Sequence, residues 1–147
     1  MRKLAWVVLL LLALGLLAQT GRMRDRLAAS RMLRQVELLS MAALSRGEMP
    51  RGLVPANLEL LRRAAALDRI EVGIPVARGT QYLLLGNGDQ AASAYLAALD
   101  LEPRPEIHLN LGRALLMAGD REGARKEFRL ALRLDPHLGP MIPAELR

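Results

Sequence analysis

An internal repeat with an interval of 33 residues is the feature that most constrains this chain. Glycine, alanine, aromatic and proline residues recur at that offset, in the pairs Gly79 and Gly112, Ala91 and Ala124, Tyr95 and Phe128, Ala98 and Ala131, and Pro103 and Pro136. Self-similarity at a fixed period of about 20–50 residues is typical of stacked repeats. The sequence therefore predicts units that pack side by side over somewhat less than half of the chain.

Each copy is predicted to be a helical hairpin. Within each copy, the helix breakers "GNGD" at 86–89 and "AGD" at 118–120 separate the two helices, because glycine readily takes the left-handed conformation that ends a helix. Asp89 and Asp120 follow the breakers, so we expect each to cap the next helix. Pro103 ends the second helix of its hairpin, as does the matching proline of the later copy.

Small residues predict where the two helices of a hairpin cross closely. Gly79 and Gly112 lie inside predicted helices, where glycine costs about 1 kcal/mol relative to alanine. We expect Tyr95 and Phe128 to fill the space that these glycines leave open.

The repeat resembles the tetratricopeptide repeat (TPR) family, whose pattern runs aromatic, Leu-Gly, Tyr, then Ala, Phe and Pro. The second copy carries His108, Leu111, Gly112, Leu115, Ala124, Phe128 and Pro136 at that spacing, and the first carries Pro75, Arg78, Gly79, Tyr82, Ala91, Tyr95 and Pro103. The opening Trp is missing from both copies, Arg78 replaces the Leu, and the interval is one residue short of the usual ~34. The ankyrin signature is absent. The resemblance covers 72–136 and implies an all-α, short TPR-like helical-hairpin solenoid.

A degenerate repeat is predicted upstream. "AALDRIE", which ends the helix 57–71, parallels "AALDLEP" of the next unit. Its first helix would come from 26–47, where Ala29, Met32, Leu33, Val36, Leu39, Ser40 and Ala43 share one face. A proline-containing loop at 48–56 would join the two helices.

The amino end predicts a transmembrane or signal-anchor helix over 1–21. Two basic residues precede an uncharged run from Leu4 to Gly21, a length between a signal-peptide core and a membrane span. A small-x-small cleavage site is poorly matched, which favours a retained anchor over a cleaved leader. The alternative is a cleaved, soluble exported TPR protein.

Charge is concentrated beside this run. Residues 1–54 carry nine Lys/Arg and three acids, whereas residues 55–147 carry twelve of each. A basic cluster follows the apolar run and consists of Arg22, Arg24, Arg26, Arg31 and Arg34. It suits anionic lipid headgroups, and it equally suits a solvated helix face. Nucleic acid is disfavoured as a partner, because the repeats lack a basic stripe with stacking aromatics.

The predicted location is a bacterial inner (cytoplasmic) membrane with a single pass. Arginines after the run favour repeats in the cytoplasm by the positive-inside rule, whereas the secretory character of the opening favours the periplasmic or exported side. We take the exported side as the working expectation. The absence of cysteine fits either compartment.

Catalysis, metals and cofactors are not predicted. His108 and His137 are 29 residues apart, with no cysteine and no H-x-x-x-H pair. His108 stands where the TPR pattern has an aromatic, so a packing role is expected. No serine has a nucleophile-elbow context, which leaves an unrecognised hydrolase as a remote alternative.

The resemblance implies a groove formed by the first helices of the hairpins. Its predicted lining is Val76, Thr80, Leu83, Leu84, Glu106, Leu109, Arg113, Leu116 and Met117. Such an apolar groove would take a partner's peptide or amphipathic helix, although the same residues could instead meet the chain's own helices or tail. Asn110 and Arg113 alone do not make the carboxylate clamp of chaperone co-factors.

The tail 139–147 is short and proline-containing. Either the last hairpin stays partly uncovered, or Leu138, Met141 and Ile142 cover it.

The predicted organisation is an anchor at 1–21, a basic juxtamembrane helix and loop at 22–54, a degenerate repeat helix at 55–71, TPR repeats at 72–104 and 105–138, and a tail at 139–147. The predicted function is a non-catalytic protein–protein interaction adaptor, an accessory or assembly subunit of a membrane or cell-envelope complex. Partner, pathway and oligomeric state are left open by the sequence.

Overall fold

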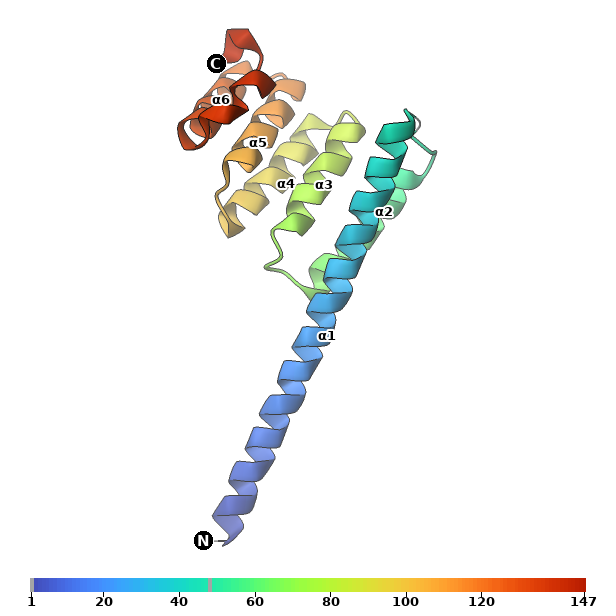
Figure 1. The fold of residues 1–147 in the computed structure, drawn as a ribbon, viewed down its shortest axis with the longest axis vertical. Helices are drawn as coiled ribbons and strands as arrows, with labels where there is room; N and C mark the ends of the chain where they lie inside the picture. The colour runs from blue at the N-terminus through green and yellow to red at the C-terminus, as the bar shows by residue number, and fades with distance from the viewer. Residues whose placement is uncertain (1, 48) are drawn as a thin grey trace.

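The computed structural model describes residues 2–47 and 49–147, with side chains from Leu10 onward, and shows six α-helices arranged as three hairpins (Figure 1). The elements, in chain order, are α1 Arg2–Arg46, α2 Leu53–Leu67, α3 Gly73–Leu84, α4 Gly88–Leu101, α5 Pro105–Met117, α6 Arg121–Leu134, and the 3₁₀ helices η1 Pro136–Met141 and η2 Ala144–Leu146. Each helix packs against the next, and α3 also contacts α1 and α5. The predicted all-α solenoid of stacked hairpins is confirmed.

The turns within the second and third hairpins form as expected at glycine. Gly86 and Gly119 adopt φ angles of +71° and +90°, in the left-handed region that glycine tolerates. Asp120 caps α6, because its Oδ1 accepts a hydrogen bond from Gly123 N at 2.8 Å. The expectation for Asp89 was wrong. The cap of α4 is Asn87, whose Oδ1 accepts from Gln90 N at 3.1 Å, because the helix already begins at the residue before the carboxylate.

Close crossing at glycine organises the core of these two hairpins. A Cβ on Gly79 would lie 2.7 Å from Tyr95 Cζ, and one on Gly112 would lie 2.5 Å from Phe128 Cε1. Both aromatic side chains are fully buried. The rings therefore occupy the volume that the glycines free, as the spacing predicted.

The first hairpin pairs the carboxyl half of α1 with α2. Ala29, Leu33 and Val36 of α1 pack with Leu61 of α2 and Ile74 of α3 in one buried cluster. Residues 26–46 thus supply the first helix of this unit. The second helix begins at Leu53, inside the segment predicted to be loop, because Pro55 fits the first turn of a helix, where no amide hydrogen bond is lost.

A buried polar trio joins the first three helices. Asn57 Nδ2 of α2 donates to Ser40 Oγ of α1 at 3.2 Å and to Gln81 Oε1 of α3 at 3.1 Å. Gln81 Nε2 donates to the same Ser40 Oγ at 3.0 Å. Asn57 and Gln81 are 0% and 1% exposed, so these bonds form away from water and fix how α1 sits on the repeats.

The amino half of α1 projects away from the three hairpins (Figure 1). The leucines described there are 53–67% exposed, and they are Leu10, Leu11, Leu12, Leu14, Leu16 and Leu17. Residues 2–21 of the predicted transmembrane segment 1–21 form the start of this helix, and the segment's first nine side chains lie outside the described residues. In the described part of the chain, no helix is both long and apolar enough to cross a membrane.

The tail covers the last hairpin. Leu138, Ile142 and Leu146 are buried in one cluster with Phe128 and Leu109. Met141, which was a candidate for this role, points to solvent at 57% exposure. The alternative of an uncovered hairpin end is wrong, because the two 3₁₀ helices fold the tail back over α5 and α6.

Candidate binding groove

An apolar groove lies along the first helices of the three hairpins. It has a volume of about 530 Å³ and receives residues from α1, α3 and α5 and from the links that precede α3 and α5. Its apolar lining is Val36, Met41, Leu44, Val72, Val76, Ala77 and Ile107. A surface of this kind accepts apolar side chains of a bound peptide or helix.

Polar groups lie around the apolar lining. Glu37 on α1, Arg104 before α5, and Glu106 and Asn110 on α5 contribute charges and an amide. The Arg104 guanidinium binds Glu102, which holds the pKa of that carboxyl below its usual range. The groove therefore combines apolar area for affinity with side chains that can orient a ligand.

Thr80 connects the groove to the repeat core. Its Oγ1 lies 3.2 Å from Val76 O, to which it donates, and 3.2 Å from Tyr95 Oη. Burial raises the pKa of the Tyr95 phenol, which keeps this hydroxyl neutral and available for hydrogen bonding. The Thr80 side chain is therefore fixed by its contacts with Val76 and with the buried Tyr95.

The structure brings three of the predicted lining residues together in this groove, namely Val76, Thr80 and Glu106. The other six lie outside it and are Leu83, Leu84, Leu109, Arg113, Leu116 and Met117. Leu109 is buried under the tail, and Arg113 Nη2 donates to Met141 O at 3.4 Å. These two side chains meet the folded tail, one of the two roles considered for them.

Among the lining residues that the sequence did not predict, α1 contributes more than any other single element. Met41 and Leu44 line the groove, and both are exposed. The signal was present in the sequence, because segment 26–47 was predicted to be the first helix of a repeat, and first helices form the groove.

His108 packs between the last two helices. Its Nδ1 lies 2.8 Å from Glu127 Oε2, with both side chains largely buried. This contact joins α5 to α6 in the position where the repeat pattern has an aromatic. In the described residues, no group of three or more His, Asp and Glu side chains is placed to hold a metal ion.

The five predicted headgroup arginines lie exposed along α1. Arg26 forms an ion pair with Asp68, in which Arg26 Nε lies 3.8 Å from Asp68 Oδ2. Their role toward lipid stays a prediction.

Comparison with known proteins identifies the repeats. Residues 76–138 match the tetratricopeptide repeat family. These residues form tetratricopeptide repeats. A thermophilic TPR protein from Thermus thermophilus has a similar crystal structure, with 29% identity, a TM-score of 0.62, and coverage of 85% of this chain and 69% of that one. No curated protein matches the chain.

The TPR fold identifies a protein–protein interaction module. The hairpin formed by α1 and α2 begins before the matched residues and supplies one wall of the TPR groove.

Proposed function

We propose that this TPR protein is a non-catalytic adaptor that binds an amphipathic helix or peptide of a partner protein in the groove between α1, α3 and α5. The observation that carries the proposal is the groove itself, with an apolar lining drawn from three hairpins and polar groups beside it. An amphipathic helix would place its apolar stripe against Met41, Val76 and Ile107. Glu37 and Glu106 favour a ligand with basic residues flanking that stripe.

Site-specific photo-crosslinking tests the groove. A photoreactive residue replaces Thr80 in the groove, and in a second variant it replaces Ser93, which is exposed on α4 outside the groove. We expect the variant at position 80, expressed in the native cell, to form a covalent adduct with a defined partner. Equal adducts from both positions would contradict the proposal.

A pair of charge substitutions provides a second test. Met41→Glu introduces a carboxylate at an exposed groove position, and Leu96→Glu does so at an exposed position on α4. Burying an unpaired carboxylate at an interface costs several kcal/mol, so Met41→Glu should abolish partner capture. Leu96→Glu should retain it, and helicity should be native in both variants.

We further propose that the adaptor works at a bacterial inner membrane, as an accessory subunit of a membrane complex with its repeats on the exported side. Support comes from the exposed leucines of α1 between Leu10 and Leu17 and from the arginines that follow them. Exposed leucine favours the acyl region, and arginine favours anionic headgroups.

Intact mass and vesicle flotation test this location. The full-length mass and flotation with anionic vesicles are expected, and replacing Leu11, Leu14 and Leu17 by Ser should abolish flotation. Loss of about twenty amino-terminal residues, the length expected of a secretory leader, would favour the soluble exported alternative.

A further inference from the structure

Five cationic side chains cover the outer face of α6, on the side of the last hairpin away from the core. They are Arg121, Arg125, Lys126, Arg129 and Arg133, here called the basic ridge. All five are exposed. Together with Asp120, Glu122 and Gly123 they line an open depression of about 830 Å³.

The charge of the basic ridge is not compensated within the part of the chain that the structure describes. None of its five cations forms an ion pair there. Glu127 of the same helix is turned to His108, and Asp120 accepts the capping hydrogen bond from Gly123. Glu122 is the one acid of α6 left beside five cations.

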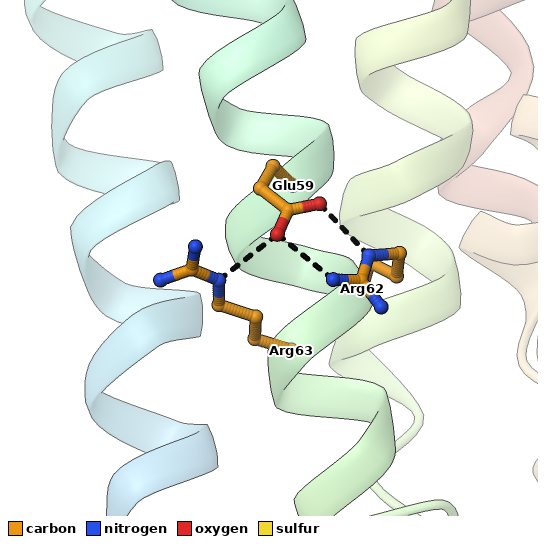
Figure 2. A network of polar contacts seen from close by, with 3 residues as sticks. All are labelled: Glu59, Arg62 and Arg63. Atoms are coloured by element: carbon orange, nitrogen blue, oxygen red, sulfur yellow. Dashed lines mark hydrogen bonds and ion pairs between the residues drawn. The ribbon is translucent and has the colours of Figure 1, made fainter.

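The arginine pair on α2 shows the contrasting arrangement (Figure 2). Glu59 accepts from Arg62 Nε at 2.8 Å and from Arg63 Nε at 2.9 Å, so both guanidinium groups are already bound to a carboxylate. The guanidinium groups of the basic ridge keep their donors for an external acceptor.

The spacing of the basic ridge defines the shape of that acceptor. Arg121, Arg125, Arg129 and Arg133 recur at every fourth residue, which places successive Cα atoms about 6 Å apart along the helix. An extended peptide points alternate side chains to one side at intervals of about 6.6 Å. A strand with a carboxylate at every second position therefore has nearly the same axial step as the basic ridge, and it must wind with the ridge, which turns by about 40° around the helix axis at each step. The guanidinium fork suits carboxylate geometry.

Other polyanions fit this surface less well. Single-stranded nucleic acid needs aromatic platforms for stacking, and the only aromatic residue of α6, Phe128, is fully buried. A helix that lies in a membrane surface inserts an apolar face, and that face of α6 is buried as Ala124, Phe128 and Ala131. We propose that the basic ridge is a second docking site, separate from the groove, which binds an extended acidic segment of a partner protein with Asp or Glu at alternate positions.

The test measures binding of labelled synthetic peptides to the full chain at low ionic strength. The probe is an eight-residue peptide alternating Glu and Ser, and its control alternates Gln and Ser. Neutralising Arg125 and Arg129 together (R125Q/R129Q) should weaken binding of the Glu peptide on the order of tenfold, since each charge-assisted contact contributes modestly. The matched R62Q/R63Q variant should bind within about twofold of the unaltered chain, because these arginines already hold Glu59.

Two further arms separate this site from other surfaces. Met41→Glu, which alters the groove, should leave binding of the Glu peptide unchanged. Equal binding of the Glu and Gln peptides would overturn the proposal, as would unaltered binding by R125Q/R129Q. Tighter binding to an oligothymidylate of matched charge, or to anionic vesicles through α6, would overturn the choice of an acidic protein segment.

Discussion

Gly112 lies directly against the ring of Phe128, so close that a Cβ on the glycine would be 2.5 Å from Phe128 Cε1. The two residues are 16 positions apart and belong to facing helices of the third hairpin. Because the ring is fully buried, it has no free space into which it can retreat.

Gly112→Ala should therefore destabilise the chain although alanine is the better helix former. Overpacking costs about 1–3 kcal/mol, which exceeds the helix-propensity gain of about 1 kcal/mol. Gly21→Ala is the matched control, because that helical glycine has open space around its Cβ position and should stabilise α1 slightly. Chemical denaturation monitored by circular dichroism measures both. A Gly112→Ala variant as stable as the unaltered chain would contradict the packing argument.

Asn57→Leu should cost about 1–3 kcal/mol, because it removes the donor to Gln81 Oε1 and leaves that buried acceptor without its partner. Replacing all three polar side chains, as Ser40→Ala, Asn57→Leu and Gln81→Met, should recover most of the loss. Urea unfolding of the single and triple variants measures the difference. This account would be refuted if the triple variant were less stable than Asn57→Leu by more than the combined cost of the cavities that the two added substitutions create.

Asn87→Ala should cost about 1 kcal/mol, because its side chain caps α4. Asp89→Ala should cost less, about 0.3–1 kcal/mol, because Asp89 interacts only with the helix dipole in the first turn. Thermal unfolding of the two variants ranks them, and the reverse order would show that Asp89 is the cap.

Glu59 should titrate far below an ordinary glutamate. Hydrogen bonds from Arg62 and then Arg63 lower its pKa from 4.5 to about 2. Because the folded pKa is depressed, the stabilisation is present above pH 4.5 and is lost as the pH falls toward 2. The carboxyl is exposed, so added salt should raise the pKa back toward its usual value. Carboxyl-carbon NMR of the unaltered chain and Arg62→Gln measures this, and a pKa near 4.5 at low salt would disprove it.

Leu146→Ala should destabilise the last hairpin by about 2–4 kcal/mol, because its side chain is fully buried in the cluster under the tail. Met141→Ala should have almost no effect, since that side chain is exposed. Hydrogen exchange of α5 and α6 amides in both variants locates the change. Equal protection in the two would mean that the tail does not cover the hairpin in solution.

The repeats could be predicted from sequence because they depend on residue types at fixed spacings along the chain. Gly79 and Tyr95 recur as a pair, and Gly86 and Gly119 occupy the left-handed turn positions. The packing of the tail could not be predicted in this way. Leu146 is buried against the last hairpin only because two short 3₁₀ helices reverse the chain. Most of the groove lining was missed, and the part on α1 was missed for a related reason. Met41 belongs to a helix without the repeat's marker residues, and its place depends on tertiary packing through Ser40 and Asn57.

The continuity of α1 has a mechanical consequence. One uninterrupted helix runs from the projecting leucines to Leu44 in the groove wall, with no glycine turn or proline between them. The end that carries the leucines and the end that lines the groove therefore rotate together. A partner or surface that binds the leucines therefore also sets the orientation of the groove. Rotation of α1 by that partner would be transmitted through Ser40 to the helices packed against it.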